Sequence, residues 1–148
     1  MQTVVRNFKI QPSKMRLLKI LFLVFIGHFF LHSCNLTEKY KHDLLSDNVT
    51  TICKACYELG EARDTSSVKL LLSNILDPRI SHDLRFKGMS VSQCRTGALK
   101  KISGIDVLRK TDEYIPDTTA VSFYLEWAVK EKHIQDKNEV DIYYFKQH

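Results

Sequence analysis

Apolar residues recur at helical spacing through most of the chain after residue 47. In each of the first two segments they fall at i, i+3, i+4 and i+7, which places them on one face of an α-helix. The first segment, 48–59, has its apolar face at Ile52, Ala55, Cys56 and Leu59. The second, 65–76, has it at Val68, Leu71, Leu72, Ile75 and Leu76. The pattern predicts two consecutive amphipathic helices.

Residues that cap or stop helices bound these two segments. One of the pair Asp47–Asn48 can cap the first helix, and Gly60 is placed to end it. One of the pair Asp64–Thr65 can cap the second helix. Proline disfavours helix at the residue before it, so Asp77–Pro78 ends that helix.

Two further helices are predicted after residue 89. Ser90 and Gln93 have the spacing of a capping box, and the helix that they open stops near Ser103–Gly104. Its inward positions are Val91, Cys94, Ala98 and Ile102. After a linker that ends at Pro116, Asp117 caps the next helix. Its inward positions are Val121, Tyr124, Leu125, Ala128 and Val129. The tail Val140–His148, which includes Ile142, Tyr143, Tyr144 and Phe145, is expected to form a short packed cap, and the sequence does not predict the fold of residues 134–148.

The sequence indicates that the predicted helices repeat in pairs. The evidence is that Asp64–Val68 (DTSSV) recurs as Asp117–Val121 (DTTAV), 53 residues later. The stretch Tyr57–Asp64 (YELGEARD), followed by a helix with Val68 and Leu72, resembles the turn and second helix of short HEAT-like repeats. This resemblance covers roughly residues 48–129. It implies an all-α fold: a short right-handed stack of antiparallel helix pairs, a HEAT/armadillo-type α-solenoid of about two repeats plus caps. The domain would span 48–148, with 34–47 as a linker or capping helix.

The positive net charge comes entirely from the N-terminal segment. Residues 1–34 hold five of the 22 basic residues and no acid, which leaves 17 basic residues against 17 acidic residues in the remainder. The part after Cys34 is therefore neutral. Nucleic-acid binding is not expected, because that affinity depends on an excess of Lys and Arg facing phosphates.

Residues 1–33 are predicted to be a targeting segment. A basic run at Met15–Lys19 precedes the 12 residues Ile20–Leu31, which are almost wholly apolar. As a helix they rise only ~18 Å, less than the ~30 Å hydrocarbon core of a membrane. Leu31–Cys34 (LHSC) then resembles a bacterial lipobox, in which the Cys receives a lipid and becomes the new N-terminus. Residues 1–14 look like an upstream extension, and Met15 is an alternative start.

Lipidation of Cys34 is the preferred interpretation, and three others stay open. The segment also fits ordinary secretory cleavage or an uncleaved anchor, and Cys34 also fits a thiol that follows the apolar run by chance. Asn35 and Asn48 each begin an Asn-x-Thr pattern, which would matter in a eukaryotic secretory protein.

The three later cysteines, Cys53, Cys56 and Cys94, allow several kinds of chemistry. Cys53 and Cys56 form a CxxC, but it lies mid-helix with no βαβ pattern nearby, so core cysteines are expected rather than a thioredoxin-like site. A disulfide from Cys94 to Cys53 or Cys56 is also possible, because the first helices of adjacent repeats lie side by side. Such a bond suits an exported protein, which meets oxidising conditions. A zinc site would need a fourth ligand such as His82, and no metal or cofactor is expected.

The segment Arg79–Met89 is predicted to be a basic loop between repeats, where binding residues often gather. Its candidate binding residues are Arg79, His82, Arg85, Phe86 and Lys87. Alternatively, Ile80, Leu84 and Phe86 tuck back onto the helices and the loop is only solvated. No nucleophile sits in a recognisable catalytic motif, so an enzyme is not expected.

These observations predict an exported protein of the cell envelope that is lipid-anchored through Cys34. By analogy with repeat proteins, its expected role is to bind or scaffold another protein. A secreted or periplasmic location is the alternative to the membrane anchor. The competing function is a small exported thiol or metal-binding protein that uses Cys53, Cys56 and Cys94.

Overall fold

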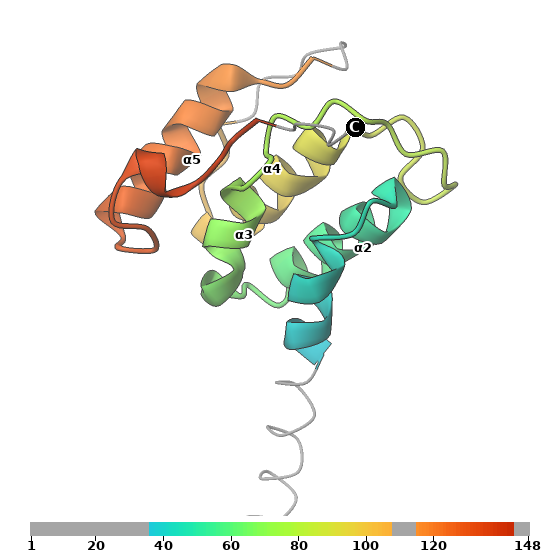
Figure 1. Ribbon diagram of the computed structural model, residues 1–148, viewed down its shortest axis with the longest axis horizontal. Helices are drawn as coiled ribbons and strands as arrows, with labels where there is room; N and C mark the ends of the chain where they lie inside the picture. The colour runs from blue at the N-terminus through green and yellow to red at the C-terminus, as the bar shows by residue number, and fades with distance from the viewer. Residues whose placement is uncertain (1–35, 108–114, 144–148) are drawn as a thin grey trace, which may run out of the picture. The chain divides into compact units, whose positions relative to one another are not determined.

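Helices make up the regular secondary structure of the computed structural model, which describes residues 36–107 and 115–143 (Figure 1). Apart from Leu36, the described residues belong to one unit, Thr37–His148. Residues 36–43 are helical. The elements that follow are α2 (Val49–Glu61), the 3-10 turn η1 (Thr65–Ser67), α3 (Val68–Leu72), α4 (Val91–Ser103), α5 (Thr118–Lys130) and the 3-10 turn η2 (Lys137–Glu139). This described part is all-α and contains no strand.

The predicted capping residues begin the three long helices. The side chain of Asn48 accepts a hydrogen bond from a backbone N–H in the first turn of α2. Ser90 and Gln93 form the predicted capping box of α4, and Asp117 accepts two backbone N–H bonds at the start of α5. Helix α4 ends at Gly104, which adopts the left-handed conformation with φ 72°. These predictions from the sequence are confirmed.

Gly60 does not end α2, contrary to the prediction. The helix continues past it, and the left-handed residue is Arg63, at φ 49°. The N–H of Arg63 donates to the carbonyl of Gly60, and the N–H of Asp64 donates to that of Leu59, which is a Schellman arrangement. Gly60 instead lets α2 approach α4 closely: a Cβ at this position would lie 3.1 Å from the Cα of Ala98.

The second predicted helix is much shorter than expected. Only Val68–Leu72 is α-helical, and Asn74 takes a left-handed φ of 53°. The cause lies at the far end of the chain. The N–H of Asn74 donates to the carbonyl of Asp141 at 2.7 Å, and that of Leu76 donates to the carbonyl of Ile142 at 3.0 Å. The C-terminal segment therefore takes the backbone groups that a longer helix would have used.

The core lies where α2 packs along α4, with α3 and α5 against the other sides of α4 (Figure 1). Most of the predicted inward positions are buried, and Leu76, Ile102 and Val129 are partly buried. The fully enclosed side chains include Ile52, Leu59, Leu71, Leu72, Ile75, Val91, Leu99 and Tyr124.

A buried arginine in α4 joins three segments of the chain. Arg95 is 2% exposed. Its Nη1 donates to the carbonyl of Leu70 at 2.6 Å, and its Nη2 donates to the carbonyl of Leu44 at 3.1 Å. Burial lowers the pKa of this guanidinium. Arg95 thus links α4, to which it belongs, with α3 and with Leu44, which follows the helical residues 36–43. Nothing in the sequence pattern predicted its burial.

The predicted targeting segment, 1–33, and Cys34 lie outside the described residues. Within residues 36–107 and 115–143, no helix is both long enough and apolar enough to cross a membrane.

Candidate functional site

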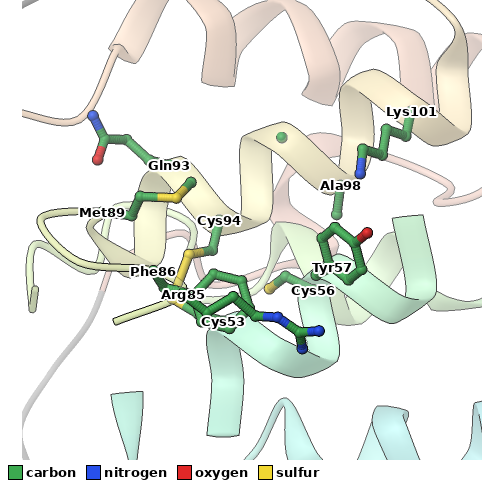
Figure 2. Close-up of a pocket in the computed structure, with 11 residues that line it drawn as sticks. Cys53, Cys56, Tyr57, Arg85, Phe86, Met89, Gln93, Cys94, Ala98 and Lys101 are labelled. Atoms are coloured by element: carbon green, nitrogen blue, oxygen red, sulfur yellow. A yellow bond between two sulfur atoms is a disulfide. The ribbon is translucent and has the colours of Figure 1, made fainter. Parts of the chain in front are cut away.

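A disulfide joins α2 to α4 (Figure 2). Of the two pairings that the sequence left open, the structure has Cys53–Cys94, with Cα atoms 5.3 Å apart. This distance lies within the usual range for bridged cysteines. The two cysteines are separated by 41 positions in the sequence. The bridge therefore fixes the side-by-side packing of the two helices.

Cys56 remains a thiol and is fully buried. Burial raises its pKa to about 12, although the positive charge of Arg95 acts in the opposite direction. The thiolate is the reactive form of cysteine, so this side chain is a neutral and inert thiol near pH 7.

The segment Arg79–Met89 is a loop closed by its own hydrogen bonds. Ile80 and Ser90 form an isolated antiparallel bridge. Ser81 and Met89 are joined by a backbone bond of 2.9 Å, and the N–H of Gly88 donates to the carbonyl of Ser81 at 3.1 Å. These bonds connect the two arms of the loop, so its tip projects from a defined base.

Arg79 holds the base of this loop. Asp77 is buried, and its carboxylate accepts hydrogen bonds from both the backbone N–H and the guanidinium of Arg79. The same guanidinium donates to the carbonyl of Asp47 at 2.8 Å. Of the five candidate binding residues, Arg79 is therefore the one that stabilises the loop rather than extending from it.

The other candidates divide between two faces of the loop. Phe86 is buried, at 6% exposed, and faces the helices, whereas His82, Arg85 and Lys87 are exposed. Leu84, at the tip, is 92% exposed. The alternative in which Ile80, Leu84 and Phe86 tuck inward therefore holds for Phe86, holds in part for Ile80, which is half-buried, and fails for Leu84.

The inner face of the loop forms a pocket of about 410 Å³ together with α2 and α4. We call it the disulfide pocket. Its lining includes Cys53, Cys94 and Cys56, the side chains of Tyr57, Phe86, Met89, Arg85 and Lys101, and the backbone at Gly97 (Figure 2). A pocket of this size lies within the range of small-molecule sites.

Two cations lie at the aromatic side of the disulfide pocket. The Arg85 guanidinium carbon is 5.6 Å from the centroid of the Tyr57 ring and 5.8 Å from that of Phe86. The Nζ of Lys101 lies 4.4 Å from the Tyr57 centroid and also forms an ion pair with Glu61. Both distances to Tyr57 fall within the range of cation–π contacts. No carboxylate is among the residues that line the pocket in the described part of the chain.

The sequence did not predict Tyr57, Gly97, Lys101 or Leu84 as residues of a functional site. A signal was present for the pocket: Cys53 and Tyr57 are four residues apart on one helix, and Gln93, Gly97 and Lys101 are four apart on another. Residues at this spacing share a helix face. The sequence could not show that these two faces meet, and it carried no signal for the exposure of Leu84.

Among the described residues, no group of three His, Cys, Asp or Glu side chains is arranged to hold a metal ion. No family model matches this chain, and neither does any curated protein or any solved structure.

Proposed function

We propose that this chain is an exported protein, lipid-anchored in the cell envelope, that binds or scaffolds another protein through the loop Arg79–Met89. The observation that carries the proposal is the exposure of Leu84, which is 92% exposed at the tip of a loop closed by its own backbone bonds. A large apolar side chain on a fixed tip can enter a pocket of a partner without first ordering the loop.

The charges around Leu84 indicate the chemistry of the partner. His82, Arg85 and Lys87 are exposed in this loop. Asp83, the one acid within it, accepts a hydrogen bond from the backbone of Arg85 at 3.0 Å. A partner with an apolar hollow and an acidic rim would complement this arrangement, and its charges would speed the encounter.

The HEAT-like interpretation of 48–129 is part of this proposal. In it, α2 and α3 form the first helix pair and α4 and α5 the second, with residues 36–43 and the C-terminal segment as caps. The side-by-side packing of α2 and α4, the first helices of the two pairs, supports it, whereas α2 and α3 make few contacts with each other.

The Cys53–Cys94 bridge supports export, because disulfides persist in oxidising compartments. The lipid on Cys34 and the targeting segment 1–33 remain predictions from the sequence. The alternative location, a secreted or periplasmic protein without the lipid, is also a prediction, as is the expectation that the protein is not an enzyme.

The alternative function, a thiol or metal-binding protein using Cys53, Cys56 and Cys94, has less support. Two of its three sulfurs are bonded to each other. The third belongs to a buried thiol whose pKa of about 12 leaves little thiolate at neutral pH.

The change Leu84→Ser tests the proposed surface. We expect it to lower the recovery of a partner at least ~10-fold from solubilised envelope membranes, because an apolar anchor in a partner pocket typically contributes ~2 kcal/mol or more. Thermal stability should be unchanged, since the side chain is exposed. Quantitative mass spectrometry of the captured proteins and a melting curve on the same preparation provide the two measurements.

Leu45→Ser is the matched control, because Leu45 is also an exposed leucine, 69% exposed, but lies outside the loop. It should leave capture as in the wild type. Equal capture by the two variants would show that the tip of the loop is not the binding surface.

A further inference from the structure

The disulfide pocket has the properties of a ligand site that is separate from the tip of the loop. Its lining combines the Cys53–Cys94 bridge with the side chains of Tyr57, Phe86 and Met89. Sulfur and aromatic groups favour an apolar and polarisable body, and sulfur–aromatic contacts are themselves attractive. A volume of about 410 Å³ admits a body of one or two rings.

The charge at the mouth of the pocket is unbalanced. Lys101 is paired with Glu61, but none of the described carboxylates pairs with the guanidinium of Arg85. Arg85 instead lies over the rings of Tyr57 and Phe86, and the residue is exposed to solvent. A planar guanidinium held beside an apolar hollow can donate two parallel hydrogen bonds to a carboxylate.

A glycine keeps the pocket open on its α4 side. Gly97 lies mid-helix, where glycine is unfavourable, yet a Cβ added there would meet no atom within 4 Å. Packing against neighbours therefore does not require glycine at this position, in contrast to Gly60. The space next to Gly97 belongs to the pocket.

We propose that the disulfide pocket binds a small amphipathic anion, with its apolar body against the Cys53–Cys94 bridge, Tyr57 and Phe86 and its acidic group on Arg85. This function goes beyond partner binding by Leu84 and does not depend on it. The ligand class is an aromatic or compact aliphatic carboxylic acid.

Binding of 2-naphthoate to the isotope-labelled mature protein, followed by amide NMR shifts, tests the proposal. The control ligand is 2-naphthamide, which has the same rings without the charge. We expect naphthoate to bind about tenfold more tightly than naphthamide, as a charge-assisted hydrogen bond would give. The shifts should centre on residues near Arg85, Gly97 and Lys101.

Three variants locate the interaction. Arg85→Ala should bring the affinity ratio of naphthoate to naphthamide close to one, because the charged contact that favours the carboxylate is lost. Lys87→Ala removes a neighbouring exposed cation that does not line the pocket, and it should behave as the wild type. Gly97→Leu should fill the pocket and abolish binding of both ligands, with a melting curve showing that the variant is folded.

Equal affinity for the two ligands, a preference that survives in Arg85→Ala, shifts elsewhere on the protein or no binding at millimolar concentration would each overturn the proposal. None of these results bears on partner capture by Leu84, so the two proposals can fail separately.

Discussion

Replacing Cys53 and Cys94 together by alanine should destabilise the protein by about 4 kcal/mol, because the bridge closes a loop of 41 positions in the unfolded chain. For a domain of this size, such a loss lowers the melting temperature by ~15 °C. The measurement is thermal unfolding followed by circular dichroism. Adding a reductant to the wild type should lower its melting temperature by a similar amount.

The single change Cys53→Ala distinguishes the structural pairing from the alternative one. Cys56 lines the same pocket as Cys94, so it is the other sulfur with which Cys94 could pair. If Cys53–Cys94 is the native bridge, this variant loses most of the stabilisation, whereas Cys56→Ala keeps its sensitivity to reductant. A wild-type melting temperature that does not respond to reductant would contradict the bridge.

Leu72→Ala should cost ~2–5 kcal/mol, the usual range for removing most of a fully enclosed leucine. Leu72 is 0% exposed and lies in α3, a helix of only five residues. So short a helix has little stability of its own and depends on packing. Since small domains are stable by only ~5–15 kcal/mol, chemical denaturation should show a large shift in midpoint.

Leu84→Ala provides the comparison for this experiment, since the same atoms are removed from a side chain that is 92% exposed. Its midpoint should move by less than the equivalent of ~0.5 kcal/mol. Similar midpoints for Leu72→Ala and the wild type would mean that the inward face of α3 is wrongly assigned.

Local signals in the sequence predicted the starts of the helices correctly. Ser90 with Gln93, and likewise Asp117, act within one helical turn, so the sequence contains the whole interaction. The inward positions follow from spacing along one helix and were also predictable. Such features need no knowledge of the rest of the chain.

Features that depend on distant segments were not predictable in this way. Helix α3 is short because Asn74 and Leu76 donate to backbone carbonyls at Asp141 and Ile142, far along the chain. Gly60 has the residue type of a helix stop, but its role follows from the proximity of Ala98. In both cases the tertiary partner decides the local structure.

The burial of Arg95 and the existence of the disulfide pocket were missed for the same reason. An arginine is expected in solvent unless partners are provided, and its two carbonyl partners, at Leu44 and Leu70, belong to other segments. The pocket combines residues of α2, α4 and the loop, and each of these looks ordinary within its own segment.

The elements that hold the disulfide pocket also fix the loop beside it. The Cys53–Cys94 bridge locks α2 against α4, and the ion pair of Asp77 with Arg79 holds the base of the loop. The candidate binding groups Leu84 and Arg85 are therefore carried on a constrained framework. This arrangement suits a binding protein, because a framework that is already ordered loses little conformational entropy when a partner binds.

The intact mass of the protein purified from its native membranes tests the central claim, an exported, lipid-anchored and disulfide-bonded chain. We predict a polypeptide that begins at Cys34, carries acyl groups and has two hydrogens fewer than its reduced form. Iodoacetamide should modify it once, at Cys56, and only after denaturation. A chain that begins at Met1 or Met15 and has all four cysteines as free thiols would contradict the account.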